Sequence, residues 1–287
     1  MGSVIDLFLP LSLAYIMFTI GTGLTFSEFR RIGSHPRDFA IGLICQIFLL
    51  PLVGFLVVVA WGASPEIAMG VMLIVAAPGG PTSNLFTRLS HGDVALSVSL
   101  TVVVSLLCVI TIPHIVGFCY PFFFGDDALE SISMGSLALR LLLMATLPVL
   151  LGMMFRQIAP QAAMRLEPWL LRGASMVFVI VIALAIYGQR ENLPGFFAET
   201  GLLTLALNLI VICLAAIIGH LLASGPRQTV AITIECGIQN GTLAIALAVN
   251  LFDGGLYVIP AATYSLLMYV TLTAAMYYFR GWAKEPA

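Results

Sequence analysis

Nine apolar stretches follow one another along the chain, and they constrain its fold more than any other feature. They lie near 4–26, 38–60, 66–90, 94–120, 134–155, 173–189, 199–223, 228–252 and 257–279. A helix that crosses the hydrocarbon core of a bilayer takes about 20 predominantly apolar residues. The pattern therefore predicts an all-α membrane protein of about nine transmembrane helices, forming a single transmembrane domain over 1–287.

The composition agrees with a lipid environment and leaves no room for a soluble domain. Of 287 residues, 60% are hydrophobic and 9% are charged, whereas soluble domains have about 25% charged residues. The N-terminus carries Asp6 and no basic segment, so it does not read as a cleaved signal peptide. The five cysteines show no C-x-x-C spacing, which argues against a disulfide framework or a zinc site. The expected environment is the lipid bilayer, with no nucleic acid and no obligate protein partner.

The basic residues indicate how the chain is oriented, because Lys and Arg concentrate in cytoplasmic loops. With nine spans, one side collects Arg30, Arg31, Arg37, Arg88, Arg156, Arg165, Arg172, Arg227, Arg280 and Lys284. The other side has Arg190 and collects Glu66, Asp126, Asp127, Glu130, Glu191, Glu199 and Asp253. This split predicts a multi-pass protein of the plasma (inner) membrane, with the N-terminus outside and the C-terminus in the cytoplasm.

Two of the nine stretches contain a polar, glycine-containing interruption. The third is broken at 78–81, Pro-Gly-Gly-Pro, and the eighth at 235–241, Glu-Cys-Gly-Ile-Gln-Asn-Gly. Unwound backbone at membrane depth requires protein or a water-filled cavity to satisfy its polar groups. Because the two stretches lie five spans apart, they cross in opposite directions, as in transporters with inverted-topology repeats. Spans one to four would then pair with six to nine, and the broken helices would cross near the midplane.

Glu235 is the one acidic residue well inside an apolar span. An ionisable group at that depth indicates a functional site, and no Arg or Lys lies nearby in the sequence to pair with it. A proton or a metal cation can neutralise it, and sodium favours carboxylate, amide, hydroxyl and carbonyl oxygens. Such oxygens occur at Gln46, Ser83, Asn84, Ser97, Thr101, Gln239 and Asn240. Taken singly, each hydroxyl could instead bond its own helix, and Gln46 could simply join two helices.

The two breaks also suggest where a substrate binds. New half-helices would begin near Pro81 and Asn240, and helix N-termini favour anions through free amides and the helix dipole. Thr82 follows the first break, and Gly241 follows Asn240 at the second. A small organic anion is therefore the expected substrate. Sodium beside it would couple the two binding events by Coulomb attraction.

The motifs P-G-G-P-T-S-N at 78–84 and E-C-G-I-Q-N at 235–240 resemble those of the bile acid:sodium symporter family. The similarity covers nearly the whole chain, including the run G-D-V-A-L-S-V-S-L-T that ends at Thr101. It implies core and panel domains, with 66–120 and 228–252 in the core, and two sodium sites behind the crossing. The first site would use Ser83, Asn84, Ser97, Thr101 and Glu235. The second would use Gln46, Glu235 and Gln239 with the backbone carbonyls of Cys236 and Ile238. Substrate contacts would fall at Pro81, Thr82, Asn240 and Gly241.

The chain departs from the family pattern at Pro81, where many members have Thr, so one substrate-side hydroxyl and one amide are missing. The substrate is expected to be either a bile-acid-like steroid or a small carboxylate. A proton-coupled organic anion transporter using Glu235 is the main alternative, and a channel or an intramembrane enzyme is less favoured. Asp93 and Asp253 lie at span ends, and no H-E-x-x-H motif is present, so we expect no enzyme.

Overall fold

A computed structural model describes residues 2–25, 33, 36–125, 133–188 and 193–282, and all regular elements in these ranges are helical. Several charged residues used above to orient the chain lie outside the described residues. They are Arg30, Arg31, Asp126, Asp127, Glu130, Arg190, Glu191 and Lys284. The all-helical prediction is confirmed for the described part of the chain.

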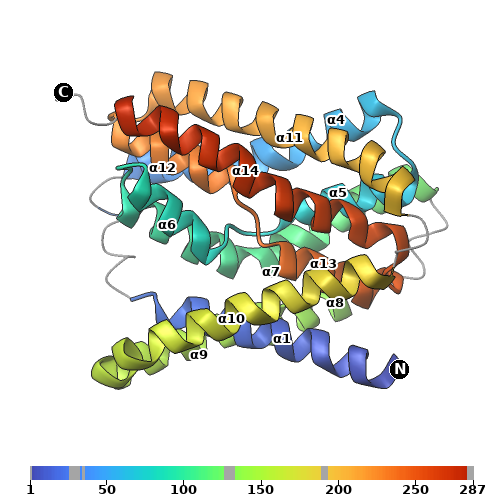
Figure 1. Cartoon of the computed structure of the whole chain (residues 1–287), viewed down its shortest axis with the longest axis horizontal. Helices are drawn as coiled ribbons and strands as arrows, with labels where there is room; N and C mark the ends of the chain where they lie inside the picture. The colour runs from blue at the N-terminus through green and yellow to red at the C-terminus, as the bar shows by residue number, and fades with distance from the viewer. Residues whose placement is uncertain (1, 26–32, 34–35, 126–132, 189–192, 283–287) are drawn as a thin grey trace.

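The helices follow one another with short connections (Figure 1). They are α1 (Gly2–Thr22), α3 (Pro36–Ile44), the π-helix η1 (Cys45–Leu49), α4 (Leu50–Trp61), α5 (Pro65–Ala76), α6 (Pro81–Leu89), α7 (Val94–Phe124), α8 (Met134–Leu141), the π-helix η3 (Leu142–Thr146), α9 (Leu147–Ile158), α10 (Pro160–Gly188), α11 (Leu193–Leu222), α12 (Pro226–Gly237), α13 (Gly241–Phe252), the 3-10 turn η4 (Gly255–Tyr257) and α14 (Val258–Trp282).

Six segments of the described chain are long and apolar enough to cross a membrane. They are Pro36–Trp61, Val94–Phe124, Met134–Ile158, Thr200–Leu222, Pro226–Phe252 and Gly255–Arg280. Two shorter apolar helices, Pro10–Thr22 and Pro65–Ala76, accompany them. These helices are consistent with an all-α membrane protein, and the count of nine spans stays a prediction.

The helical segment extends further into the second interruption than the sequence predicted. At the first, Pro81 begins α6 as expected, a position that suits Pro because the first helical N–H needs no partner. At the second, Glu235 and Cys236 still belong to α12, because the N–H of Ile238 donates to the carbonyl of Ile234 at 3.0 Å. Non-helical backbone at the second interruption is thus confined to 238–240 rather than 235–241.

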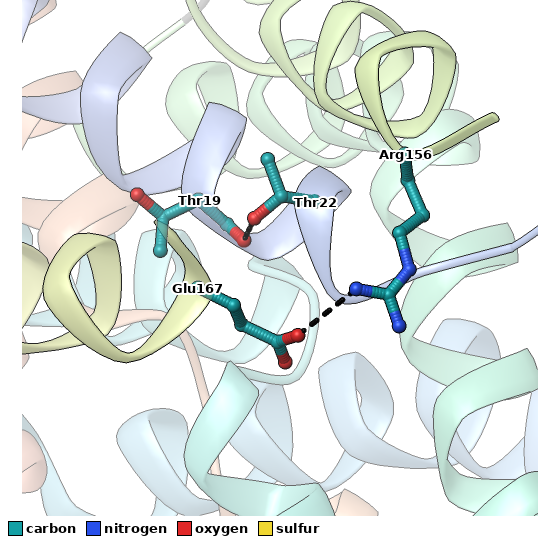
Figure 2. A network of polar contacts seen from close by, with 4 residues as sticks. All are labelled: Thr19, Thr22, Arg156 and Glu167. Carbon is teal, nitrogen blue, oxygen red and sulfur yellow. Dashed lines mark hydrogen bonds and ion pairs between the residues drawn. The ribbon is translucent and has the colours of Figure 1, made fainter. Parts of the chain in front are cut away.

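Helix α10 also begins earlier than the apolar stretch 173–189 suggested. It starts at Pro160, so residues 160–172, expected as a loop, are helical. Charged side chains here do not oppose a helix, since Arg and Glu are good helix formers. Figure 2 shows Glu167 of α10 directed toward Arg156 of α9, and their side chains form an ion pair of 3.1 Å. This pair links the two helices beside Thr19 and Thr22 of α1.

Helices α1, α9 and α10 lie together along one side of the molecule in Figure 1, with the remaining labelled helices beyond them. Helix α1 packs on both α9 and α10. Its contact with α9 is close because two glycines face each other, and a Cβ on Gly152 would lie 2.8 Å from the Cα of Gly21. Small residues allow helix backbones to approach closely in membranes. On the other side, α11 packs on α12 and α14, and α5 packs on α7.

Candidate functional site

The two helix interruptions are in direct contact. The backbone N–H of Asn240, between α12 and α13, donates to the carbonyl oxygen of Pro78, between α5 and α6, at 2.8 Å. Both connections lie near the middle of the molecule in Figure 1. Unwound backbone from one interruption therefore satisfies unwound backbone from the other, which meets the requirement for paired polar groups away from water.

Glu235 is fully buried in the last turn of α12, and two hydroxyls of α7 hold its carboxylate. Ser97 Oγ lies 2.8 Å from Oε2, and Thr101 Oγ1 donates to Oε1. The backbone of Gly79 packs against the same carboxylate, since a Cβ added to Gly79 would overlap Oε1 of Glu235. Within the described residues, these partners of the carboxylate are neutral, and no Arg or Lys pairs with it.

The hydroxyl cluster around Glu235 has more acceptors than protons. Ser97 has a single hydroxyl hydrogen, yet Asn84 Oδ1 lies 2.9 Å from its Oγ and Glu235 Oε2 lies 2.8 Å from it. Thr87 in turn donates to Ser97 at 3.3 Å. Ser83 gives its hydrogen to the carbonyl of Gly80 at 2.7 Å, so it brings an oxygen to the cluster and no further proton. An added cation or an added proton would relieve this excess of acceptors.

Gln46 and Gln239 add two more buried oxygens near the end of α12. Gln46 Nε2 donates to the backbone carbonyl of Glu235 at 3.1 Å, and Gln239 Nε2 donates to the carbonyl of Cys236 at 2.9 Å. The Oε1 atoms of both amides are buried, and among the described residues neither has a hydrogen-bond partner. Buried polar atoms are nearly always satisfied. Two bare amide oxygens close to the end of α12 therefore mark a candidate binding site.

The residues predicted from sequence to hold cations thus lie around one helix terminus. Ser83, Asn84, Ser97 and Thr101 surround the Glu235 carboxylate, and Gln46 and Gln239 attach to the backbone next to it. Cys236 and Ile238 are buried in the same turn. Their role as sodium ligands stays a prediction. Gly79 and Thr87 were not identified from sequence, although both lie in or beside the first motif.

A cavity of about 520 Å³ lies beside the two interruptions. Thr82, Asn240 and Gly241 line it, as the predicted substrate site requires. The side chain of Pro81 lies outside what the structure describes. The remaining lining residues come from α1, α6, α10, α13, α14 and the two interruptions: Ile16, Gly80, Leu85, Leu171, Ala174, Ser175, Phe178, Val179, Gln239, Thr242, Met268 and Tyr269.

Two helices begin at this cavity. Asn240 caps α13, because its side-chain oxygen accepts from the N–H of Leu243 at 3.0 Å, which uses one of the two lone pairs of that oxygen. Gly80 precedes the first residue of α6. The hydroxyl of Tyr269 lies 3.4 Å from that of Thr82. Nothing in the sequence marks Tyr269 or the α10 face as part of a site, because both lie in ordinary apolar stretches.

Comparison with known families decides what kind of protein this arrangement belongs to. Residues 10–195 match the Sodium Bile acid symporter family. The chain belongs to that family. This confirms the resemblance drawn from the motifs at 78–84 and 235–240, and it makes the chain a multi-pass membrane transporter rather than an enzyme.

Relatives of this symporter-family chain occur in bacteria, plants and mammals. An uncharacterized sodium-dependent transporter of Bacillus subtilis, YocS, is 30% identical over 91% of this chain and 79% of its own length. A probable chloroplastic sodium/metabolite cotransporter of rice, BASS2, is 26% identical over 96% of this chain and 64% of its own length. The ileal sodium/bile acid cotransporter of rabbit is 29% identical over 65% of this chain and 53% of its own length. The chain therefore spans less than two thirds of these plant and mammalian relatives.

Proposed function

We propose that this chain is a sodium-coupled symporter of a small organic anion, with two sodium sites at the end of α12. The observation that carries the proposal is the set of unsatisfied oxygens around Glu235. The bare Oε1 atoms of Gln46 and Gln239 require an electropositive partner, and so does the proton-poor hydroxyl cluster of Ser97. Carboxylate, amide and hydroxyl oxygens are suitable ligands for a hard cation.

The ligands divide into two sets that share Glu235. The first would hold one sodium ion with Ser83, Asn84, Ser97 and Thr101, whose oxygens adjoin the carboxylate. The second would hold another with Gln46, Gln239 and the carbonyls of Cys236 and Ile238. The carbonyl of Cys236 already accepts from Gln239, but a carbonyl oxygen has a second lone pair.

The net charge of the occupied sodium sites links these cations to an anionic substrate. One buried carboxylate with two sodium ions has a net charge of about +1, and Coulomb attraction for an anion is strong where water is excluded. The helix N-termini of α6 and α13, at the cavity that Thr82 and Gly241 line, add positive dipole ends. Sodium binding would therefore favour anion binding, and the anion would favour sodium.

The cavity limits the substrate class. Its volume of about 520 Å³ falls within the range of about 300–1,000 Å³ typical of small-molecule sites. Apolar side chains such as Ile16, Phe178 and Met268 line much of it, and polar groups cluster at the two interruptions. An amphipathic carboxylate suits such a site, either a bile-acid-like steroid or a smaller organic acid. The printed names of the relatives include both bile acid and metabolite cotransporters.

Alternating access would arise from motion between two bodies. We assign α1, α8, α9 and α10 to a panel and the remaining helices to a core, with the cavity between them. Nine spans result if α3–α4, α5–α6, α8–α9 and α12–α13 each cross once. In support, the start of α1 and the end of α14 lie at opposite ends of the molecule (Figure 1), as an odd number of crossings requires. The N-terminus would face outward and the C-terminus the cytoplasm of the plasma (inner) membrane.

Proton coupling through Glu235 is the second candidate function. The same observation favours it, because one proton on Glu235 would donate to Ser97 and free the Ser97 hydrogen for Asn84. A proton would leave the Gln46 and Gln239 oxygens bare, and for this reason we favour sodium.

Uptake into proteoliposomes and thermal unfolding of the purified protein test the proposal. Both are measured in sodium, potassium and choline, with a panel of bile acids and small carboxylates. We expect sodium alone to raise the melting temperature, because it binds the folded state, and to drive uptake of one carboxylate class. Equal responses to all three cations, with uptake following the pH gradient, would replace sodium by protons.

A further inference from the structure

A buried polar cluster lies behind the helix interruption, and the cation and substrate sites do not include it. It consists of Asn208 of α11 with Tyr264 and Thr271 of α14, and Asn208 and Tyr264 have no solvent exposure. Polar side chains this deep in a membrane protein carry a desolvation cost unless they are bonded. The partners of this cluster therefore indicate what it does.

The cluster converges on one backbone atom, the carbonyl oxygen of Gly237. Asn208 Nδ2 donates to it at 2.9 Å, and the hydroxyl of Tyr264 donates to it at 3.3 Å. Asn208 Nδ2 also donates to the Tyr264 hydroxyl at 2.9 Å, and the hydroxyl of Thr271 donates to Asn208 Oδ1. Every polar atom of the Asn208 side chain is thus engaged, and its amide is held in one orientation.

Gly237 is the last residue of α12, so its carbonyl has no helical partner ahead of it. The residues that follow turn away, and the N–H of Gly241 donates instead to the carbonyl of Gln239 at 3.0 Å. Asn208 and Tyr264 supply the missing donors. Packing holds the same residue, since a Cβ on Gly237 would lie 3.1 Å from side-chain atoms of Ile212 and Leu272.

The carbonyl of Gly237 lies in the same helical turn as the proposed cation ligands. Glu235 precedes it by two residues, about 200° around a helix, so the two residues face nearly opposite sides. Glu235 faces α7 through Ser97, whereas Gly237 faces α11 and α14. The peptide that begins with this carbonyl continues to Ile238, a proposed backbone ligand. Fixing the Gly237 carbonyl therefore fixes the turn that presents the cation ligands, without contact between Asn208 and the cation.

We propose that Asn208 is a positioning residue for cation binding, acting through the Gly237 carbonyl with Tyr264 as its second donor and Thr271 as its orienting partner. The inference rests on the proposed sodium-coupled function and extends it to a cluster on α11 and α14. A positioning role makes a specific demand. Loss of the cluster should weaken sodium binding while leaving saturated transport largely intact.

The test measures the sodium midpoint, which is the sodium concentration that gives half of the maximal effect. It is measured both for thermal stabilisation and for uptake, in full-length variants. Asn208→Leu removes every hydrogen bond of the amide at similar volume, and Tyr264→Phe removes one donor while keeping the ring. Thr271→Val removes the orienting donor. Thr204→Val is the matched control. Thr204 is buried one turn away on α11, donates to the carbonyl of Thr200 at 2.7 Å and also lies 3.3 Å from the Thr263 hydroxyl of α14, but it takes no part in the bonds to the Gly237 carbonyl.

We expect the sodium midpoint to rise about fivefold to tenfold in Asn208→Leu and about twofold to fivefold in Tyr264→Phe, because each variant loses one hydrogen bond to the Gly237 carbonyl and the bond from Asn208 is the shorter. Thr271→Val should give the smallest rise of the three, and Thr204→Val should match wild type. Uptake at saturating sodium should approach the wild-type rate in each variant. A purely structural role would instead lower the sodium-free melting temperature and leave the midpoint where it is.

Two failures are distinguishable. A wild-type protein without any sodium response overturns the proposed function, and the positioning role with it. A sodium-responsive wild type with unchanged midpoints in Asn208→Leu and Tyr264→Phe, or an equal shift in Thr204→Val, overturns the positioning role alone. If Asn208→Leu does not fold, Tyr264→Phe decides by the same criterion, because phenylalanine preserves the packing of the ring.

Discussion

The N–H of Asn240 donates to the carbonyl oxygen of Pro78 at 2.8 Å, so a backbone hydrogen bond joins the two helix interruptions. Side-chain mutations cannot remove this bond directly. Together with the Gln46 amide on the Glu235 carbonyl, at 3.1 Å, it ties α12 to the residues before α6 and to η1. In the proposed mechanism, the cation ligands would therefore move as one unit during transport.

Glu235→Gln removes the charge that both proposed sodium sites share, and we expect it to abolish sodium stabilisation and sodium-driven uptake together. Gln46→Ala removes a ligand from one site, so it should retain part of the stabilisation while cutting coupled uptake. Melting temperature against sodium concentration, with uptake in proteoliposomes, measures both. If protons drive transport, Glu235→Gln should mimic the protonated state and retain substrate exchange, and neither variant should depend on sodium. Identical sodium responses in wild type and both variants would remove Glu235 and Gln46 from the site.

Ser97→Ala and Thr101→Val each remove a hydroxyl that contacts the Glu235 carboxylate. We expect each to raise the sodium midpoint at least tenfold, since hydrogen bonds to charged groups contribute about 1.5–3 kcal/mol and about 1.4 kcal/mol is tenfold in affinity. Ser105→Ala is the control, because Ser105 is buried one turn beyond Thr101 on α7 and its hydroxyl has no partner among the described residues. A shift in Ser105→Ala as large as in Ser97→Ala would mean that α7 packing, and not ligation, sets the midpoint.

Two adjacent glycines allow a steric test of the site. A Cβ at Gly79 would overlap Glu235 Oε1, whereas the nearest atoms to a Cβ at Gly80 lie 3.7 Å and 3.8 Å away. Gly79→Ala should displace the Glu235 carboxylate and raise the sodium midpoint of thermal stabilisation at least tenfold. Gly80→Ala should respond to sodium like wild type. Thermal unfolding in a sodium series compares them. Equal midpoints for the two variants would contradict the placement of the Glu235 carboxylate against Gly79.

Filling the cavity should separate substrate binding from sodium binding. Ser175→Trp adds a large side chain to the lining of the cavity, so we expect uptake to fall at least tenfold while sodium still raises the melting temperature. Met176→Trp is the control on the same helix, because Met176 is exposed and does not line the cavity. Unchanged uptake in Ser175→Trp would place the substrate elsewhere.

The ion pair between Arg156 and Glu167 should contribute little to stability and nothing to sodium binding. The two side chains are 20% and 32% exposed, and their atoms lie 3.1 Å apart (Figure 2). Partly exposed pairs contribute about 0.2–1 kcal/mol. A double-mutant cycle with Arg156→Gln and Glu167→Gln, followed by thermal unfolding, should give a coupling energy in that range with an unchanged sodium midpoint. A larger coupling, or a shift in the midpoint, would show that the α9–α10 contact influences the cation site.

The sequence alone determined the membrane environment, the helical class and the two interruptions, and it indicated Glu235 as a candidate site residue. Each of these depends on local information, namely the length of an apolar stretch, the chemistry of Pro and Gly, or a lone carboxylate within twenty apolar residues. The exact ends of the helices were harder to predict from the sequence. Glu235 and Cys236 are helical because Ile238 can still bond Ile234, which the residue types do not reveal.

Only the tertiary structure decided which distant side chains meet. Gln46 reaches the Glu235 carbonyl, α10 closes the cavity opposite Thr82, and Asn208 with Tyr264 caps Gly237. Apolar helices in a membrane carry little sequence information about which face meets which neighbour, because lipid and protein contacts are similarly apolar. Their pairing depends on close packing of small residues, such as Gly21 against Gly152, and on a few buried hydrogen bonds formed only once the whole bundle assembles.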